Sequence, residues 1–456
     1  MGRLHALEGD LRKLKRSILP LVYFRTQKIL SAFPNRVLQP IFDYSTVSID
    51  VSDFPGPLTE LTFCGSRILE LHHIFGLMPG TNGAYILQAF GFDSQWPLKN
   101  IVGILRTSVL FKDPNRVHKI LHEEALQMVT RVKEAAKKNG GKVDLSNDSF
   151  EYVTNSSARV LLGVRPPPGT LDDLRQLTAL VNRILSFCYL LPHCLIRFFF
   201  QSRLNMITNR IVTRISPIVE EFQTNLDLDS SILLRRAADW RHPESGEPFS
   251  TEDICRAIVC LLYVSSESST AGVSNTILDL ASNPEAYHKF REETGPILRA
   301  GRLDALVKDA YVHACVLESA RMNVTALPVN REIKNKKHIG DYYIGDADVI
   351  AVCAEVLHNK KRAGDRFFDN PTDFRPERFL SSENGTKMMN PMVLMSWGAG
   401  LHICPGRNLA QMEIKIGVAV LLEHVDIDLP NIEIMGPTLF SNAALYQRDH
   451  KLNIKW

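Results

Sequence analysis

One cysteine of this chain lies in a sequence environment that suits metal binding. Cys404 stands directly before Pro405-Gly406, inside the stretch Met395–Ala410 (MSWGAGLHICPGRNLA), and a helix-like run, Asn408–Leu422, follows. The N–H groups and the positive dipole end of a helix N-terminus stabilise an anion and so lower the pKa of a nearby thiol. Because the thiolate is the form that ligates metal, the pattern predicts a loop that presents one thiolate to a cofactor.

Two other interpretations of this loop are less well supported. Cys404 could be a buried structural cysteine beside a turn. Gly398 and Gly400 also begin a GxG pattern, which is the start of a dinucleotide-binding loop. Ile403, however, stands where the third glycine of GxGxxG belongs, and no strand-to-helix context surrounds it.

A second chemical feature is a polar patch inside the longest predicted helix, Thr251–Asn283. Ser250 or Thr251 can cap this helix, and Asn283-Pro284 ends it. Its middle reads Ser265–Thr270 (SSESST), although serines weaken a helix interior. The carboxylate of Glu267 is costly there unless it is exposed, paired or in use. The patch is therefore either a solvated helix face or a functional site.

A third feature is a pair of opposite charges on the predicted helix Val307–Met322. Glu318 and Arg321 are three residues apart, so they share a helix face and can pair. Such a pair is often an ordinary surface salt bridge. Here it precedes the stretch Phe374–Phe379 (FRPERF), which in turn precedes the cysteine loop.

Taken together, these features resemble the cytochrome P450 family over about residues 250–420. The loop is similar to the haem-binding pattern FxxGxRxCxG: Gly400, Cys404 and Gly406 match, while Trp397 replaces Phe and His402 replaces Arg. The ExxR pair and FRPERF match two further family motifs. The polar patch is similar to the family's AGxDTT-like segment, with Glu267 at the acid, Ser268 at the alcohol and Ser265 in place of glycine. A register shifted by one residue would place Ser269 at the alcohol instead.

The resemblance implies a mainly α fold with small β-sheets, formed by a large helical domain and a smaller β-rich part. It also implies haem b as the cofactor, with Cys404 as the axial ligand of the iron. His402 and Arg331 would bind the propionates, Gly400 would let the loop approach the haem, and Trp397 would pack near the thiolate.

Further roles follow from the same resemblance. Glu267 and Ser268 would relay protons to iron-bound dioxygen. Glu318, Arg321 and Arg378 would form a buried structural triad, since buried charges must be paired. His358 matches a histidine that we interpret as structural. The family's WxxxR helix, which binds a propionate, has no match here; the substitutes to consider are Arg116, His118 and His122, or these are an ordinary solvated face.

The activity implied is insertion of one oxygen atom from O2 into a small lipophilic substrate. Similarity to eukaryotic, in particular fungal, members favours a role in secondary metabolism. Electrons would come from an NADPH-cytochrome P450 reductase, docked on a basic surface with Arg407 and Lys415, unless those charges are merely solvated. Two alternatives stay open: a reductase-independent isomerase or dehydratase, since WGAG at Trp397–Gly400 is similar to members that isomerise a peroxide, and a degenerate haem-binding protein without turnover.

Composition narrows the class of protein. A net charge of +3 gives no argument for nucleic-acid binding. The eight cysteines include no CxxC pair, and the seven other than Cys404 are interpreted as buried free thiols.

Residues 1–60 are expected to be an N-terminal segment without a clear transmembrane anchor, followed by a single domain over 61–456 whose motif-bearing core is 250–422. Leu61–Leu71 could form a hairpin.

One apolar stretch, Asn182–Phe200, has two interpretations. It is either a buried pair of helices or a peripheral membrane contact, with Arg197 and Arg203 at the lipid headgroups. The second interpretation favours the cytoplasmic side of the endoplasmic reticulum membrane, and the first a soluble cytoplasmic protein. The helices Phe111–Lys138 and Ser149–Gly163 complete the prediction.

Overall fold

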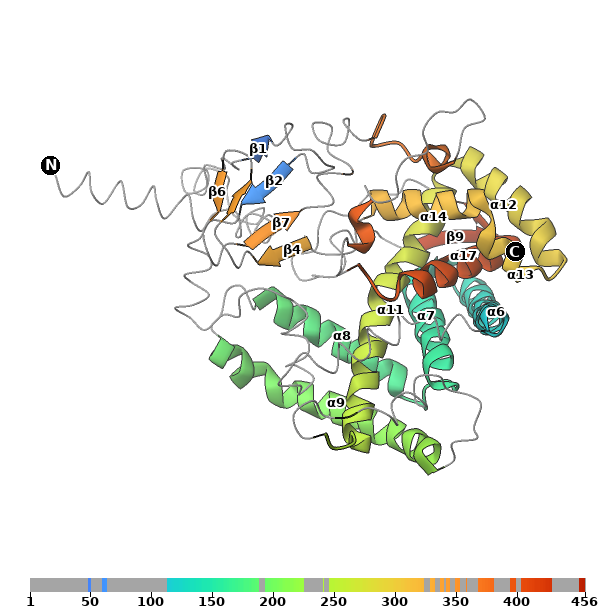
Figure 1. The fold of residues 1–456 in the computed structure, drawn as a ribbon. Coiled ribbons are helices and arrows are strands. Elements are labelled where there is room, and N and C mark those ends of the chain that lie inside the picture. Colours follow the sequence, from blue (N-terminus) through green and yellow to red (C-terminus); the bar gives the residue numbers. More distant parts are fainter. Residues whose placement is uncertain are drawn as a thin grey trace.

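The part of the chain that the structure describes is mainly helical, with three small antiparallel sheets, as the sequence predicted (Figure 1). The structure is a computed structural model. It describes residues 48–50, 60–63, 113–187, 193–224, 241, 246–323, 329–332, 337–339, 342–344, 349–352, 358, 368–380, 394–398, 403–428 and 451–455.

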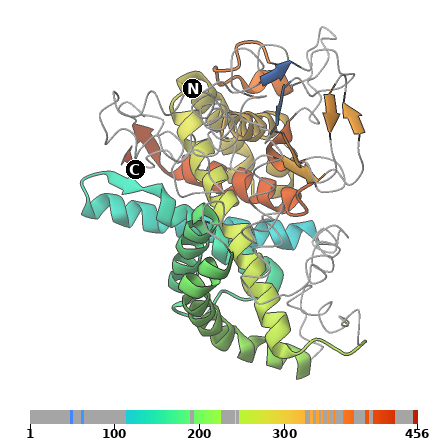
Figure 2. The same cartoon turned by 90° about the vertical axis from the view of Figure 1, so that its left-hand side faces the viewer.

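The long helix α11, Thr251–Ala281, crosses the molecule and contacts most of the other large helices (Figures 1 and 2). A capping box starts it. The backbone N–H of Asp253 donates to the Ser250 hydroxyl (3.1 Å), and the Ser250 N–H donates to the Asp253 carboxylate (3.2 Å). The next helix, α12 (Pro284–Arg299), begins at the predicted proline. The predicted start of the central helix is therefore confirmed, and the helix ends at Ala281, two residues before the predicted Asn283.

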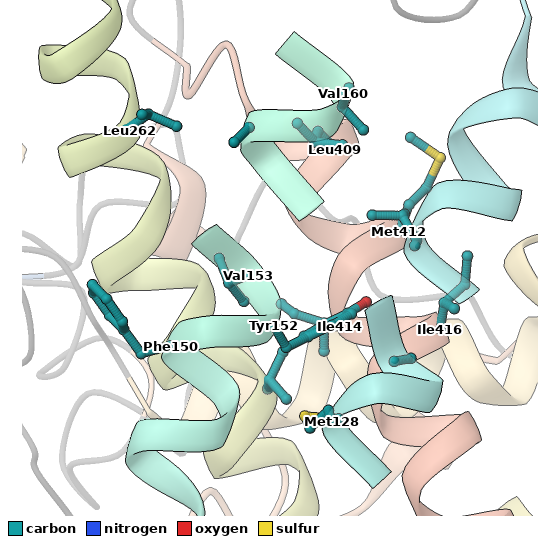
Figure 3. Packing of buried hydrophobic residues seen from close by; sticks show 14 of the residues in the cluster. Met128, Phe150, Tyr152, Val153, Val160, Leu262, Leu409, Met412, Ile414 and Ile416 are labelled. Carbon is teal, nitrogen blue, oxygen red and sulfur yellow. The ribbon is translucent and has the colours of Figure 1, made fainter. Parts of the chain in front are cut away.

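The core beside α11 is built from α6 (Pro114–Lys138), α7 (Leu145–Leu162) and α17 (Arg407–His424). Figure 3 shows apolar side chains from all of these helices meeting in one cluster. Helix α7 begins four residues earlier than predicted because the Asp144 side chain caps it, accepting from the Ser146 N–H at 2.9 Å. It ends as predicted at Gly163, whose φ of 83° is left-handed.

The helix predicted over Val307–Met322 is in fact divided. Residues Leu303–Lys308 form the short helix α13, and Ala310–Met322 form α14. Asp309 lies between them with extended backbone and caps α14, since its carboxylate accepts from the Val312 N–H at 2.8 Å. The aspartate is a capping residue that the sequence interpretation placed inside a helix.

The stretch Asn182–Phe200 contributes to two helices, α8 (Thr170–Phe187) and α9 (His193–Thr224), which pack against each other. Asp173 of α8 pairs with Arg210 of α9 at 2.6 Å and also with Arg214. Helices α8 and α9 lie beside the lower half of α11 in Figure 1. Among the residues that the structure describes, no helix combines the length and apolar character needed to cross a bilayer.

The largest sheet has the strand order β1-β2-β7-β4. Strand β2 (Glu60–Phe63) lies between β1 (Ser48–Asp50) and β7 (Val349–Val352). Both described partners of β2 therefore lie outside Leu61–Leu71, the predicted hairpin. Strand β4 (Val329–Glu332) completes the sheet. The other sheets contain the strands β3 (Lys142–Asp144), β9 (Lys451–Lys455) and β8 (Asp426–Asp428), and β5 (Lys337–Ile339) and β6 (Tyr342–Ile344).

Candidate functional site

Cys404 lies just before the first residue of α17, as predicted. Its backbone N–H donates to the Trp397 carbonyl at 2.8 Å, and its carbonyl accepts from the Arg407 N–H at 3.3 Å. Trp397 ends the short 3-10 helix η4, Met395–Trp397. These bonds hold the cysteine at the N-terminus of α17, where Gly406 is the N-cap without any side-chain cap.

The expected lowering of the thiol pKa does not hold. Burial raises the pKa of the Cys404 thiol, and this outweighs hydrogen bonds from the backbone of Gly406 and Arg407 and the Arg407 charge, which all lower it. Desolvation disfavours the thiolate more strongly than a helix end stabilises it. A coordinated cation would reverse that balance, since metal binding deprotonates a thiol outright.

A cavity that is partly open to solvent lies between α11, α14, η4 and α17, with about 410 Å3 of empty space when the open solvent at its mouth is included. Ser268 and Gly272 of α11 line it on one side, and Trp397 and Ile414 on the other. The indole Nε1 of Trp397 is buried, and none of the described residues accepts its hydrogen. The polar remainder of the lining comes from Asn275, Thr276, Ser319, Asn323 and Ser396.

One strip of α11 is open, although most of the helix is buried. Val264 is 52% exposed, and Ser268, one turn later on the same face, is also exposed. The strip continues into the cavity at Gly272. A helix that exposes an apolar residue next to a cavity has a face available for a large apolar ligand.

The hydroxyls of the polar patch are mostly satisfied within the helix. Ser266 donates to the Leu262 carbonyl (2.6 Å), Ser265 donates to the same carbonyl (3.2 Å), and Thr270 donates to the Ser266 carbonyl. Back-bonding of this kind explains how so polar a segment stays helical. The patch is therefore not simply a solvated face.

The two predicted catalytic residues do not share an environment. Ser268 lines the cavity. Glu267 lies about 100° away around the helix, and its charge contributes to the raised pKa of Tyr263. The described lining of the cavity includes Ser268 but not Glu267.

The predicted buried triad is present. Glu318 Oε2 accepts from Arg321 Nε (2.8 Å), and Glu318 Oε1 accepts from Arg378 Nε (2.9 Å) and from the Arg375 backbone N–H (2.8 Å). Glu318 and Arg321 are fully buried. The Arg321 guanidinium donates further to the carbonyls of His358 (2.9 Å) and Pro371 (2.7 Å).

Two contacts connect this triad to the cysteine loop. The Met395 N–H donates to His358 Nε2 at 3.2 Å, and the Ser396 hydroxyl donates to the Ala320 carbonyl at 2.5 Å. Both contacts fix η4, whose last residue accepts the Cys404 N–H. His358 is fully buried, so its structural interpretation agrees with its position.

Other predicted residues lie elsewhere or outside the described part. Arg331 is in β4, opposite Ile350 of β7. Gly400, His402 and Arg197 fall outside the residues whose side chains the structure describes.

The possible WxxxR substitutes lie on α6. His118 lies beside Asp304 and Lys308, and His122 beside His424 at the far end of α17. That end is roughly 25 Å from the cysteine end by helix rise. Arg116 is in the first turn of α6. His118 is 5% exposed, so the solvated-face interpretation is wrong for this residue, whereas Arg116 and His122 are half-buried.

The surface interpretation of Lys415 is wrong. This side chain is 5% exposed, and its ammonium donates to the Val307 carbonyl at 2.6 Å. Burial lowers the Lys415 pKa to about 8. Of the two proposed docking charges, Arg407 is half-buried and is the one that still reaches the surface.

Sequence reasoning missed Glu413 on α17. It is 1% exposed, and it accepts from the Ser157 hydroxyl of α7 at 2.9 Å. Burial raises its pKa to about 8. The available signal was an acidic residue between Met412 and Ile416, two positions predicted to be in the core.

Comparison with known families decides the fold class. The family model described as Cytochrome P450 matches residues 104–455. The chain belongs to the cytochrome P450 family.

Several named proteins are similar to this P450 chain in sequence or in fold. It is 28% identical to a probable lanosterol 14-alpha demethylase of Acanthamoeba polyphaga mimivirus, over 77% of this chain and 49% of that protein. It is 26% identical to the self-sufficient cytochrome P450 monooxygenase CYP505AG1 of Oidiodendron maius, over 48% of this chain and 21% of that protein. The chain thus spans half or less of these two relatives. The solved structure of the cytochrome P450 CYP102L1 covers 86% of this chain, and this chain covers 84% of it, with a TM-score of 0.65 and 16% identity, which shows the shared fold.

Proposed function

We propose that the chain binds haem b through Cys404 and acts as a haem-thiolate monooxygenase on a small lipophilic substrate. The observation that carries the proposal is the cavity bounded by Ser268 of α11 and by Trp397, whose carbonyl holds the Cys404 N–H. Two further observations support the fit of haem. The buried Trp397 Nε1 lacks a partner among described residues, and the open strip at Val264 and Ser268 offers a face for a large flat ligand.

Each residue has a distinct role in this proposal. Cys404 ligates the iron, and Trp397 packs beside the thiolate and tunes it. Bound haem supplies the oxygen activation and transfer, with electron density pushed onto it by the thiolate. The Ser268 hydroxyl holds a proton at its Oγ and passes it through water in the cavity. Glu267 delivers protons to the turn of α11 that carries Ser268, from the side of the helix that does not line the cavity. His402 and Arg331 bind the haem propionates.

Substrate and partner are proposed at the level that the relatives allow. Their names include a sterol demethylase and monooxygenases, so the substrate is proposed only as small and lipophilic. A role in secondary metabolism is supported by the sequence similarity to fungal members alone. Electrons come from a separate NADPH-dependent reductase, although one relative is named a self-sufficient monooxygenase.

The first test is the carbon-monoxide difference spectrum of the dithionite-reduced protein. We expect the long-wavelength Soret band that names the family, and its loss in Cys404→Ala. Cys260→Ala is the matched control, since this thiol is buried in α11 and its pKa is raised to about 12 by burial. Absence of haem from well-folded parent protein contradicts the proposal. A short-wavelength band alone favours the degenerate haem-binding alternative.

The isomerase or dehydratase alternative requires a second measurement. A monooxygenase consumes NADPH when the reductase is present, whereas an isomerase needs no electrons. The exposed Ser268 hydroxyl at the cavity supports the monooxygenase, because the monooxygenase reaction needs proton delivery and the isomerase reaction does not. Conversion of a lipid peroxide without NADPH consumption would favour the alternative.

We also propose a peripheral membrane contact at the start of α9, on the cytoplasmic side of the endoplasmic reticulum. Phe198 is 78% exposed and Phe199 62% exposed, and their rings make an edge contact at 5.2 Å. Met206 and Arg203 on the same helix are also exposed. Exposed aromatic rings with a nearby arginine suit the lipid interface.

Flotation with liposomes tests this contact. The double variant Phe198→Ser and Phe199→Ser is expected to lose flotation while keeping its fold, because both rings are exposed. Phe200 is left intact because it packs against the core. Val164→Ser, at another exposed apolar residue, is the control that should float like the parent. Equal flotation of the double variant and the parent would contradict the contact.

A further inference from the structure

Glu413 joins three helices inside the protein. Its carboxyl group on α17 accepts from the Ser157 hydroxyl of α7 at 2.9 Å and is hydrogen-bonded to the Ser269 hydroxyl of α11. Its backbone carbonyl accepts from the Tyr152 hydroxyl of α7 at 2.8 Å. All four residues are buried. One side chain therefore fixes the relative position of α7, α11 and α17.

Ser269 differs from its neighbours in the polar patch. Ser265, Ser266 and Thr270 donate back to carbonyls of their own helix, whereas the Ser269 hydroxyl reaches across to α17. Ser269 follows Ser268, which lines the cavity. Because adjacent helix residues point about 100° apart, holding Ser269 against α17 fixes the direction in which Ser268 points.

The packing around Glu413 leaves little freedom for this turn. A Cβ added at Gly272, one turn after Ser268, would lie 2.6 Å from Ile414 Cδ1, so α11 and α17 are in direct contact there. Figure 3 shows Tyr152 and Ile414 next to each other where these helices meet α7. Glu413 precedes Ile414 on α17. The hydrogen bond and the close helix contact thus act on the same part of α11.

We propose that Glu413 is a positioning residue that holds the turn of α11 carrying Ser268 in place. The inference rests on the proposed function, since the direction of Ser268 matters for catalysis only when the cavity holds haem. Burial favours the neutral form of this carboxyl group and outweighs the contacts with the Ser157 and Ser269 hydroxyls, which favour the ionised form. The raised pKa of Glu413 agrees with a neutral form near pH 7.

The test compares four variants of the full chain. Glu413→Gln keeps the shape with a donor and an acceptor, whereas Glu413→Leu and Ser269→Ala remove the bond between α17 and α11. Gln411→Leu is the matched control, because it removes another buried polar side chain of α17, whose Nε2 has no partner among the described residues.

The first readout is amide hydrogen exchange in the haem-loaded and haem-free protein. Losing one buried hydrogen bond is expected to speed exchange about tenfold over residues 265–272 in Glu413→Leu and Ser269→Ala. Exchange in α14 should not change. Glu413→Gln and Gln411→Leu should match the parent. Parent-like exchange over 265–272 in Glu413→Leu, or uniform loss of protection in all helices, would overturn the inference.

The second readout is NADPH oxidation with reductase in the loaded protein. We expect a fall of about tenfold to 100-fold in Glu413→Leu and Ser269→Ala, with the reduced carbon-monoxide band retained and Glu413→Gln close to the parent. Equal loss in Glu413→Gln and Glu413→Leu would overturn positioning by hydrogen bonding. If the parent itself has no such band, the proposed function fails, while hydrogen exchange still decides the position of the turn.

Discussion

Two regions around the cavity each contain a buried glutamate, and they satisfy it in opposite ways. On the cysteine side, Glu318 is paired with Arg321 and Arg378 and also accepts a backbone N–H. On the α11 side, Glu413 is hydrogen-bonded to the hydroxyls of Ser157 and Ser269. The first is a charged network, and the second is a neutral one.

This difference indicates how firmly each side is held. Removing one partner from a buried charged network leaves an uncompensated charge and costs about 3–5 kcal/mol. A neutral hydrogen bond contributes only about 1 kcal/mol. The loop of Cys404 is therefore fixed through a charged network that includes Arg321, whereas the turn of Ser268 is held by a weaker neutral hydrogen bond and by close packing against Ile414.

The largest expected effect is loss of the triad. Arg378→Ala should lower the free energy of unfolding by about 3–5 kcal/mol, because Glu318 stays buried without one of its cations. Urea unfolding followed by circular dichroism measures it. Glu377→Gln, at the neighbouring and exposed carboxylate that pairs with Lys289 at 3.3 Å, should change stability by less than about 1 kcal/mol. Similar losses in both variants would show that the two regions do not differ as described.

The next effect is a pH dependence specific to Glu413. Its pKa is about 8 in the folded protein against 4.5 for a free glutamate. The folded state therefore binds more protons between these values, so this group lowers the free energy of unfolding as pH rises. The slope reaches about 1.4 kcal/mol per pH unit for one proton.

Unfolding at several pH values from 5 to about 8 tests this slope. Tyr152 on α7 interacts with Glu413 and also with Glu124 on α6. His313 contributes with the opposite sign because burial and nearby cations lower its pKa to about 4. Subtracting the curve of Glu413→Gln from that of the parent isolates Glu413. A flat difference would mean that Glu413 is ionised in the folded protein over this pH range.

The sequence predicted the charged region well and the neutral region poorly. Glu318, Arg321 and Arg378 belong to spaced motifs, and the structure places them together as expected. Helix ends marked by Ser250, Pro284 and Gly163 were also confirmed, because capping is a local property of the chain.

What the sequence could not give depends on contacts between distant segments. The partners of Glu413 come from residues more than a hundred positions away along the chain, such as Ser157, and a helical pattern does not reveal them. Burial of Lys415 and the raised thiol pKa of Cys404 also follow from packing around them. The break at Asp309 depends on the local sequence, but an aspartate inside a helix-like run does not by itself predict where a helix ends.

A smaller effect concerns the two glycines at the helix contacts of α17 with α7 and α11. In Gly417→Ala, the new Cβ would lie 2.5 Å from the Tyr152 ring, whose hydroxyl is fixed by the Glu413 carbonyl. We expect a loss of about 1–3 kcal/mol from overpacking. In Gly272→Ala, the Cβ meets the terminal Cδ1 of Ile414 at 2.6 Å, which can rotate away.

Thermal unfolding of both glycine variants provides the measurement. Gly272→Ala should be close to neutral, since the better helix propensity of alanine, about 1 kcal/mol, offsets the rotation of Ile414. A larger loss in Gly272→Ala than in Gly417→Ala would show that α11 is held more rigidly than its neutral hydrogen bonds suggest.

The smallest stability effect is expected at Ser268. Its side chain is exposed at the cavity, so Ser268→Ala should change the free energy of unfolding by no more than about 0.5 kcal/mol. Ser266→Ala is the control inside the same patch, since that hydroxyl is buried and bonded to the Leu262 carbonyl at 2.6 Å. NADPH oxidation with reductase should fall in Ser268→Ala and stay near the parent value in Ser266→Ala. A loss of stability without a change in NADPH oxidation at Ser268 would mean that this hydroxyl supports the fold, and the proton relay would then have to be sought elsewhere on the α11 side.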